Sequence, residues 1–225
     1  MARTVEIDIG YEPRSIFLPW HQRRQRWSAT VAHRRAGKTL ARVNALIKGA
    51  VTCPLPDPRF AYLAPTYTQA KDIAWTYLKR YGLTIPGSRA NESELFVDFP
   101  NGGRVRLYGT ENYDRMRGLY LDGAVLDEPA LMDPRVYPEV VRPALSDRKG
   151  WGDFIGTPNG KNHFYELCYG DPEGKFVGAA NDPEWYFAIH RASETKLIPE
   201  DELRDLRKTM TPEQYDQELE CSFTA

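Results

Sequence analysis

Two groups of residues in the chain carry the side chains that phosphoryl transfer needs. The first is the octapeptide Ala32–Thr39, which follows the pattern G-x-x-x-x-G-K-[ST] with alanine in place of the first glycine. In such a loop Gly37 lets backbone N–H groups approach a phosphate, Lys38 supplies a positive charge, and Thr39 supplies a hydroxyl for Mg²⁺. Taken alone, the octapeptide is as compatible with a basic turn as with a phosphate-binding loop.

The second group is the acid pair Asp127 and Glu128, which ends an apolar run that begins at Leu121. In a nucleotide hydrolase, an aspartate at this position holds Mg²⁺, and the next glutamate orients and polarises the attacking water. Both groups are expected at the carboxyl ends of parallel strands, where such sheets bind ligands. An isolated acid pair is commonly a solvated strand end, but together with the loop it indicates nucleotide hydrolysis.

Phosphoryl transfer also needs a cation close to the γ-phosphate. Arg34 and Arg35 lie inside the loop, and Arg115 and Arg117 precede the acid strand. An arginine ahead of that strand can face its own site or the site of a neighbouring subunit. Thr157 follows another apolar run in the tripeptide Gly-Thr-Pro, where it is either a γ-phosphate sensor that couples hydrolysis to motion or a hydroxyl that caps the next helix.

Other polar residues give weaker signals. Gln22 carries an amide that can pair with the edge of adenine, although surface placement explains a lone glutamine equally well. The four histidines lack the spacing of metal ligands. The three cysteines form no C-x-x-C pair, which argues against both a disulfide framework and a zinc site. We therefore expect no metal beyond the Mg²⁺ of a nucleotide site.

The charge of the chain is unevenly distributed. The segment 13–56 contains nine Lys or Arg residues and no Asp or Glu, although the net charge of the chain is −1. Such a block suits a nucleotide or nucleic acid, or forms a solvated basic face. No apolar run is long enough to span a membrane, and the first residues lack the apolar region of a signal peptide. We therefore expect a cytosolic protein without membrane contact.

Periodicity and breaker residues predict alternating strands and helices, and this order indicates a parallel sheet with right-handed crossovers. Residues 1–15 are expected to form an irregular arm, and a hairpin is expected around Asn101-Gly102-Gly103. The expected strands are 26–31, 59–65, 94–99, 104–108, 121–128, 152–158 and 185–190. The expected helices are 40–50, 67–81, 134–145, 162–169, 199–210 and 212–220, the last two each starting at a proline.

Taken together, the motifs resemble those of the ATPase domain of the large terminase subunit, the motor that packages DNA into the capsids of tailed bacteriophages. Terminases often lack the first loop glycine and carry an arginine two residues before the Gly-Lys pair, as Ala32 and Arg35 do here. The similar segments are Leu18–Gln22, Arg34–Thr39, Ala64–Lys71, Arg117–Gly118, Val125–Glu128, Gly156–Gly160 and Asn162–Tyr165.

The resemblance implies an α/β P-loop NTPase of the ASCE or RecA-like type, with a mostly parallel central sheet flanked by helices. It implies a core over residues 1–180 and a small helical lid or linker subdomain over 181–225. It also assigns roles within an ATP site. Gln22, Arg34, Arg35, Ala36, Gly37, Lys38 and Thr39 would bind ATP; Thr39 and Asp127 would hold Mg²⁺; Glu128, Lys38 and Arg117 would be catalytic; and Thr157 would couple hydrolysis to motion.

In this family Arg117 would act as an arginine finger on the next subunit, with Arg115 and Arg35 as the alternatives. The implied partners are double-stranded DNA, a portal protein, a small terminase subunit and further copies of the chain in a ring, a pentamer by resemblance. The implied location is the host cytoplasm. Large terminases usually also carry an RNase H-like nuclease domain. The sequence stops about where that domain would begin, so we expect no DNA cleavage from this polypeptide.

Two other functions fit part of the pattern. A superfamily-2-like helicase would share the loop and the acids, but Asp127-Glu128 is followed by Pro129-Ala130 rather than by the residues that those helicases favour. A second RecA-like domain is also missing from the sequence. A non-catalytic nucleotide-binding module that serves assembly is the other alternative, and the complete set Lys38, Thr39, Asp127 and Glu128 argues against it.

Overall fold

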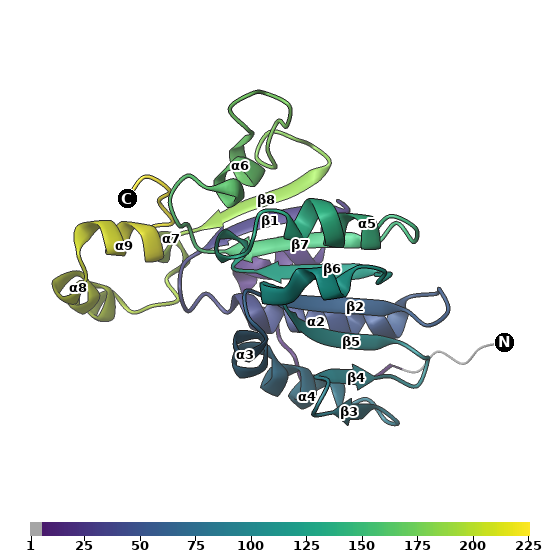
Figure 1. Cartoon of the computed structure of the whole chain (residues 1–225). Helices are drawn as coiled ribbons and strands as arrows, with labels where there is room; N and C mark the ends of the chain where they lie inside the picture. The colour runs from purple at the N-terminus through teal and green to yellow at the C-terminus, as the bar shows by residue number, and fades with distance from the viewer. Residues whose placement is uncertain (1–5) are drawn as a thin grey trace.

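The computed structural model describes residues 6–225, which form a single mixed sheet covered by helices on both faces (Figure 1). The order of the strands is β3-β4-β5-β2-β6-β7-β1-β8; β4 is antiparallel to both β3 and β5, and the other neighbours are parallel. The strands are β1 (Trp27–Ala32), β2 (Arg59–Ala64), β3 (Arg89–Asn91), β4 (Phe96–Asp98), β5 (Arg104–Gly109), β6 (Gly123–Asp127), β7 (Trp151–Gly156) and β8 (Trp185–His190).

Helical segments connect successive strands of the parallel part of the sheet, as the sequence predicts, and others precede the first strand and follow the last. The longest is α2, which follows the loop after β1, and the last two, α8 and α9, lie together next to the phosphate-loop end of the molecule. The helical segments are η1 (Ser15–Phe17), α1 (Leu18–His21), α2 (Lys38–Thr52), α3 (Tyr67–Ala70), η2 (Lys71–Trp75), α4 (Thr76–Gly82), η3 (Thr110–Met116), η4 (Pro129–Leu131), η5 (Val136–Val141), α5 (Arg142–Ala144), α6 (His163–Tyr169), α7 (Ala192–Thr195), α8 (Glu200–Thr209) and α9 (Pro212–Glu218).

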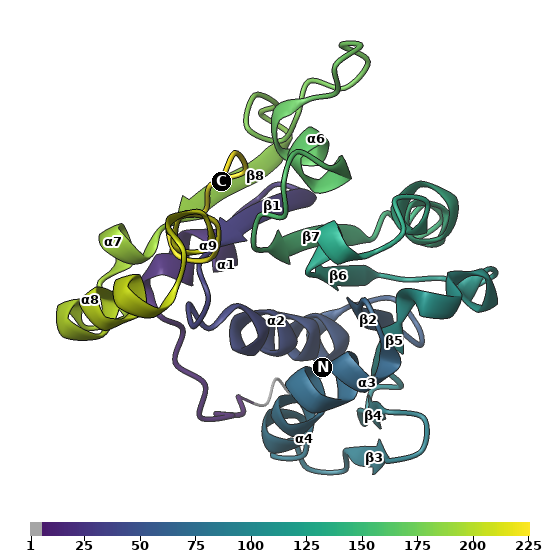
Figure 2. The same ribbon diagram turned by 60° about the vertical axis from the view of Figure 1, so that its left-hand side comes forward.

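Side chains that alternate along the central strands supply the two faces of the core. On β2, Tyr62 points into the cluster under α2 to α4, whereas Ala61 and Leu63 point into the cluster under α5 and α6. Figure 2 shows α2 and α3 on one side of the sheet and α5 and α6 on the other. Because successive side chains of a strand alternate between faces, a strand that is covered on both sides is apolar at almost every position.

The structure confirms the predicted fold class, and it adds details that periodicity did not give. The predicted helix 67–81 is one rod that contains a π-helical stretch at Lys71–Trp75, and the predicted helix 134–145 contains another at Val136–Val141. Pro138 lies within the second stretch, where proline cannot donate a backbone hydrogen bond. Strand β3 and the short helix α7 were not predicted. Of the predicted irregular arm, residues 1–5 lie outside the described residues.

Strand β8 alters the predicted division of the chain at residue 181. It pairs in parallel with β1 over six residues, from Trp27 opposite Trp185 to Ala32 opposite His190. The stretch 185–190 therefore belongs to the sheet and not to a helical subdomain. Strand pairing explains the difference, because the partner of an edge strand depends on tertiary contacts. We propose that the lid begins after His190, with α7, α8 and α9.

A buried ion pair joins α2 to the sheet. The Arg42 guanidinium on α2 donates to the Asp153 carboxylate on β7 at 2.9 Å, and both side chains are fully buried. Trp20 donates its indole N–H to the same carboxylate at 2.8 Å and lies under the guanidinium. Buried charges need such partners because solvent cannot compensate them. This network fixes the helix that carries the phosphate loop relative to β7.

No helix within residues 6–225 is long and apolar enough to cross a membrane.

Candidate nucleotide-binding site

The loop between β1 and α2 has the backbone geometry that phosphate binding needs. Gly37 precedes α2 with φ 89°, a left-handed conformation that glycine adopts without strain. Arg35 also has a positive φ, 67°, so the loop turns twice before the helix begins. The first backbone N–H groups of α2 and the positive end of its dipole therefore face the space above the loop, as in anion sites at helix N-termini. Ala36 is fully buried beneath this turn.

Lys38 spans the space between the loop and the acid pair. Its ammonium group donates to the carbonyl of Ala32 at 3.0 Å and pairs with Glu128 Oε1 at 3.0 Å. The side chain is only 10% exposed, so these contacts are largely shielded from solvent. Lys38 thus holds together the two motifs that the sequence places far apart.

Asp127 lies at the carboxyl end of β6, next to the start of α2. Its Oδ2 atom accepts a hydrogen bond from Thr39 Oγ1 at 3.1 Å and another from the hydroxyl of Tyr62. Its Oδ1 atom is buried and has no partner among the described residues. Burial and the adjacent Glu128 carboxylate raise the pKa of Asp127 to about 6, although Lys38 opposes the shift. The buried Oδ1 atom of Asp127, which has no hydrogen-bond partner among the described residues, is suited to bind a cation.

Glu128 has a strained backbone and a fixed side chain. Its φ of 56° and ψ of 54° place it in the left-handed region, which non-glycine residues adopt rarely and mostly where function demands it. Oε2 accepts hydrogen bonds from both the backbone N–H and the hydroxyl of Thr157, each at 2.9 Å. Oε1 contacts only Lys38 among the described residues. One oxygen is therefore anchored to the end of β7, and the other faces the loop.

Two residues of this site were not predicted from the sequence. Arg14, in the arm before η1, donates from Nη1 to the carbonyl oxygens of Arg35 and Ala36, both at 2.8 Å. Tyr62 supplies the second hydrogen bond to Asp127, and burial with the nearby carboxylate raises the pKa of its hydroxyl well above the ordinary value. The arm before η1 shows no hydrophobic periodicity, so the sequence does not indicate that Arg14 contacts the loop. Tyr62 sits in an apolar run, where a tyrosine is ordinarily assigned to the core.

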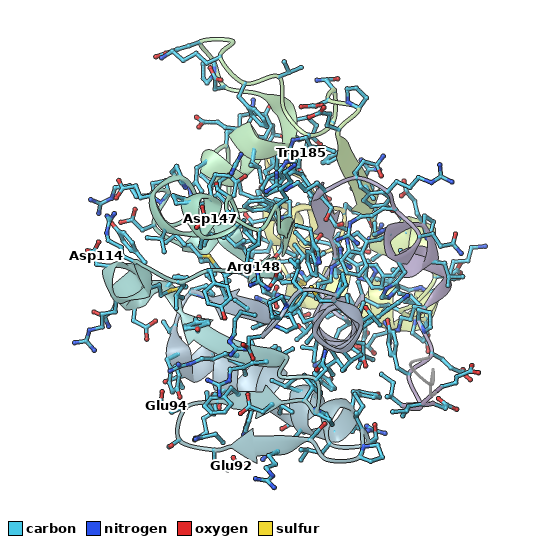
Figure 3. All side chains as sticks on the ribbon, turned by 90° about the vertical axis from the view of Figure 1, so that its right-hand side faces the viewer. Glu92, Glu94, Asp114, Asp147, Arg148 and Trp185 are labelled. Atoms are coloured by element: carbon cyan, nitrogen blue, oxygen red, sulfur yellow. The ribbon has the colours of Figure 1, made fainter. Side chains whose placement is uncertain are left out.

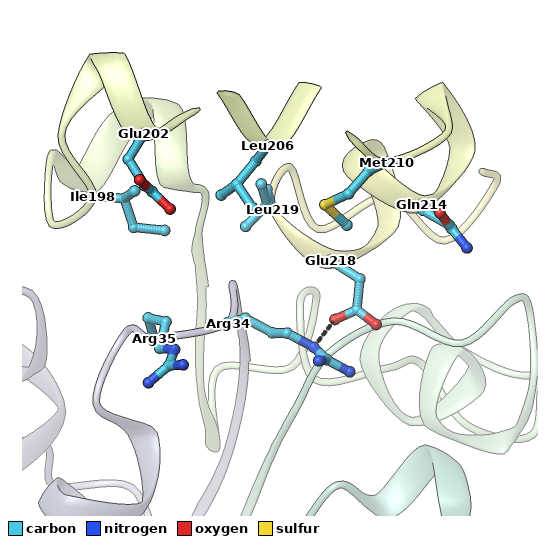
Figure 4. Close-up of a pocket in the computed structure, with 9 residues that line it drawn as sticks. All are labelled: Arg34, Arg35, Ile198, Glu202, Leu206, Met210, Gln214, Glu218 and Leu219. Carbon is cyan, nitrogen blue, oxygen red and sulfur yellow. Dashed lines mark hydrogen bonds and ion pairs between the residues drawn. The ribbon is translucent and has the colours of Figure 1, made fainter. Parts of the chain in front are cut away.

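The other face of the loop contacts α9, in the proposed lid. Arg34 pairs with Glu218 at 2.5 Å, and its backbone N–H donates to the carbonyl of the same glutamate at 3.1 Å. His33 is fully buried and its Nε2 atom lies 2.8 Å from Thr195 Oγ1. Figure 4 shows Arg34 reaching Glu218, while Arg35 lies below Ile198 and Glu202 with its guanidinium group directed away from them. The loop is therefore attached to the lid on one side and to the acid pair on the other.

A cavity of about 490 Å³ separates the loop from the lid. Apolar side chains of the lid cover it from one side, and the two loop arginines border it from the other (Figure 4). The residues that line it are Arg34, Arg35, Ile198, Glu202, Leu206, Met210, Gln214, Glu218 and Leu219.

Three predicted site residues lie away from this cluster. Gln22 ends α1 with an exposed side chain that makes no hydrogen bond to the loop within residues 6–225. Arg117 is 53% exposed and pairs with Asp114 at 2.9 Å and with Glu139 at 2.8 Å. Figure 3 shows Asp114 projecting at the periphery of the molecule. Arg115 is also exposed, and neither arginine contacts the loop of its own chain.

The side chains that the structure gathers match a magnesium nucleotide better than a protein-only metal site. No cluster of three or more His, Cys, Asp or Glu residues that could hold a metal occurs between residues 6 and 225. Mg²⁺ needs no such cluster, because it commonly takes one or two protein ligands, phosphate oxygens and water. Thr39 Oγ1 and the orphaned Oδ1 of Asp127 are suitable protein oxygens for that arrangement.

A parallel sheet whose edge carries a phosphate loop, a helix N-terminus and an Asp-Glu pair defines a P-loop NTPase. The family model for the N-terminal part of the T4likevirus-type terminase large subunit matches residues 31–225. This chain belongs to that terminase family. The terminase large subunits of Thermus virus P23-45 and Thermus phage G20c are each 29% identical to it over 179 residues. That match covers 71% of this chain and 36% of each relative, so the chain spans about a third of their length.

Solved structures show the same fold. The large terminase ATPase domain of Thermus phage P74-26 superposes with a TM-score of 0.79 at 23% identity, over 96% of both chains. The large terminase of the thermophilic bacteriophage D6E, in complex with ADP, superposes with a TM-score of 0.73 at 15% identity, over 94% of this chain and 53% of that one. Both comparisons place the chain among terminase ATPase folds, as its sequence motifs predicted.

His190, at the end of β8 beside the loop, is expected to make the fold sensitive to acid. Burial and the nearby Arg42 lower the pKa of His190 to about 4, and they lower that of His21 to about 4 as well. An unfolded histidine titrates near pH 6.5, so between about pH 6.5 and pH 4 the unfolded chain binds more protons than the native one. This contribution to stability is complete above about pH 6.5 and is lost as the pH falls toward 4.

Replacing His190 with glutamine should make the stability less dependent on pH. Because solvent reaches the partly exposed imidazole and weakens the effect of its environment, the loss of unfolding free energy between pH 7 and about pH 4.5 should shrink by about 1–2 kcal/mol. Urea denaturation of both proteins at the two pH values measures this, and the wild-type comparison cancels the opposite contribution of Asp127. Identical losses in the two proteins would contradict the prediction.

Proposed function

We propose that this chain is the ATP-hydrolysing motor domain of a viral terminase large subunit, and that it drives double-stranded DNA into a procapsid. The observation that carries the proposal is the convergence of Lys38, Thr39, Asp127 and Glu128 at one sheet edge, linked by contacts of about 3 Å. Family membership supports the same activity. The ADP complex of the D6E terminase shows that a protein of this fold binds the product nucleotide.

The contacts of Lys38 suggest how the site responds to ATP. The Lys38 ammonium pairs with Glu128 Oε1 at 3.0 Å. An incoming triphosphate brings a larger negative charge to the loop, so Lys38 moves to the phosphates and releases Glu128. The freed carboxylate oxygen then orients a water molecule and accepts its proton. Thr157 holds the other oxygen in place during this exchange, which ties the catalytic carboxylate to the end of β7.

The remaining groups position the phosphates and the metal. The loop amides at the start of α2 bind the phosphates, and the Arg14 guanidinium keeps the loop carbonyls turned away from them. Thr39 and Asp127 would hold Mg²⁺, which would supply positive charge against the phosphates. Arg34 or Arg35 binds the phosphates from the side of the lid. Arg34 becomes available when the triphosphate displaces Glu218 from its guanidinium group.

The assembly partners follow from the family. We propose that several copies form a ring, a pentamer by resemblance, in which Arg117 of one chain reaches the γ-phosphate of the next. Arg117 already sits in an exposed segment away from its own loop, which is the placement that a trans-acting residue needs. A portal protein, a small terminase subunit and duplex DNA in the host cytoplasm complete the proposed machine.

Steady-state phosphate release from ATP tests the proposal. The purified chain should release phosphate in Mg²⁺ and lose this activity when EDTA removes the metal, because Mg²⁺ neutralises the charge that builds up on the phosphates. Turnover that is unaffected by EDTA would contradict the assignment of Thr39 and Asp127. The absence of turnover at every protein concentration would favour a non-catalytic assembly module. Strand displacement on forked DNA would favour a helicase.

A further inference from the structure

A basic groove lies at the end of the sheet opposite to the nucleotide site. It has a volume of about 480 Å³, and five of its lining residues are cationic while none is acidic. These cations come from three segments, namely the stretch before β1, the last turns of α2 and the turn before β7. They are Arg23, Arg24, Arg26, Lys48 and Lys149, and Trp151 also lines the groove.

The charges of this groove are not neutralised within the chain. None of the ion pairs formed within residues 6–225 includes any of the five cations. Some exposed cationic side chains elsewhere on the molecule have an acidic partner, as Arg117 and Arg135 do, and what distinguishes this groove is that five unpaired cations line one hollow. A cluster of unpaired cations repels itself, and an anion that spans the cluster relieves this repulsion.

Two of the five cationic side chains are held in place by contacts within the chain, and the charged groups of the other three are free to bind an anion. Arg26 donates to the carbonyl oxygens of Gly150 and Leu145, and Arg23 lies over the rings of Trp20 and Trp151. By contrast, Arg24, Lys48 and Lys149 are exposed, and their side chains make no hydrogen bond within residues 6–225. Exposed cationic side chains next to two arginines that are held in place suit the phosphate backbone of a nucleic acid. Such contacts do not depend on the base sequence.

We propose that this groove binds the phosphate backbone of duplex DNA. The inference rests on the proposed function, which supplies duplex DNA as the polyanion. A chain of phosphates is favoured over a single phosphate because the cations are distributed over three segments and no side chain encloses one point. Contact with several phosphates makes the affinity fall steeply with salt concentration.

The position of the groove also links it to ATP. Helix α2 begins with Lys38 and Thr39 at the phosphate loop, and Lys48, ten residues on, lines the groove about 15 Å away along the same helix. The buried pair of Arg42 and Asp153 makes this helix move together with β7, whose first residue is Trp151. A displacement of the loop by ATP is therefore transmitted to the DNA contact without an intervening hinge.

The test compares two triple variants that remove the same charge. The groove variant is Arg24→Gln, Lys48→Gln and Lys149→Gln. The matched control is Arg204→Gln, Lys161→Gln and Lys196→Gln, which are exposed residues outside the groove. Lys149 and Lys196 both have φ 54°, so the pair is also matched in backbone conformation. Fluorescence anisotropy with a labelled blunt duplex, over a series of salt concentrations, gives the affinity and its salt dependence.

We expect the groove variant to bind duplex DNA at least about tenfold more weakly, with a salt slope lower by about two to three, because each lost phosphate contact removes about 0.9 from that slope. The control should lose far less. Equal losses in both variants, or none in either, overturn the inference. So does wild-type protein that hydrolyses ATP but does not bind the duplex, an outcome that leaves the proposed ATPase intact. Conversely, DNA binding through the groove without ATP turnover would reject the proposed motor and not the groove.

Both variants should keep the wild-type melting temperature and nucleotide affinity, since none of the six residues touches the loop. If the groove variant is unstable, Lys48→Gln alone, at an exposed position of α2, tests the same contact. Its salt slope should then be lower than that of wild type by about one, and an unchanged slope overturns the inference.

Discussion

Replacing Glu128 with glutamine should lower the kcat of ATP hydrolysis by about 10²–10⁴-fold, because the side chain can no longer accept a proton from the attacking water. The amide oxygen of glutamine can still accept the hydrogen bonds from the backbone and hydroxyl of Thr157, so the local structure should persist. Nucleotide affinity should not fall, since the carboxylate of Glu128 competes with phosphate for the Lys38 ammonium. Phosphate release measures kcat, and binding of a fluorescent ATP analogue measures the affinity.

Glu92→Gln is a suitable control for this prediction. It removes one carboxylate from an exposed glutamate that pairs with a lysine, as Glu128 does, but it lies away from the loop and from Arg117. The control should therefore hydrolyse ATP as wild type does. If Glu128→Gln hydrolysed ATP as fast as wild type, the acid pair would be structural and the proposed mechanism would fail.

Removal of the arginine finger is expected to have an effect of the same order or larger. Arginine fingers contribute about 10³–10⁵-fold to kcat in related phosphoryl-transfer sites, so Arg117→Ala should nearly abolish turnover. To reach a neighbouring site, Arg117 must leave Asp114 and Glu139, which are exposed partners that release it easily. A finger that acts between subunits also predicts that wild-type turnover per chain rises with protein concentration, as rings assemble.

A mixing experiment separates action in trans from action in cis. Arg117→Ala chains keep Glu128, and Glu128→Gln chains keep Arg117, so a mixed ring contains interfaces with one intact copy of each. Mixing the two inactive proteins should therefore restore part of the activity. No recovery in a confirmed oligomer would contradict a trans finger. Arg135→Ala, which breaks a similar exposed ion pair, should hydrolyse ATP as wild type does. The parallel variant Arg115→Ala tests the alternative finger.

The sequence predicted those features that local chemistry determines. The phosphate loop and the acid pair each combine residue types that are specific to nucleotide sites. Alternating strands and helices place both motifs at one edge of a parallel sheet. The direct contact between Thr157 and Glu128 agrees with the placement of both residues at strand ends. The geometry therefore supports the coupling role that resemblance assigned to Thr157, which stays a prediction until it is tested.

Features that depend on distant contacts could not be predicted in this way. Arg14 acts through two carbonyl groups more than twenty residues away, and Glu218 meets Arg34 only because α9 folds back onto the loop. Strand β8 was predicted as a strand, yet its partner β1 lies more than 150 positions earlier in the chain. Loop closure over such separations leaves no local pattern in the sequence, so only the folded structure reveals these contacts.

The clamp of Arg14 on the phosphate loop bears on where this fold can be cut. The family match begins at residue 31, within β1, which invites expression of a fragment trimmed to that point. Such a fragment would lose Arg14 together with Phe17 and Trp20, two of the largest fully buried side chains. It would leave Asp153 with only part of its hydrogen bonds and the loop carbonyls free to rotate toward the phosphates. The smallest foldable unit therefore begins upstream of the recognisable motifs.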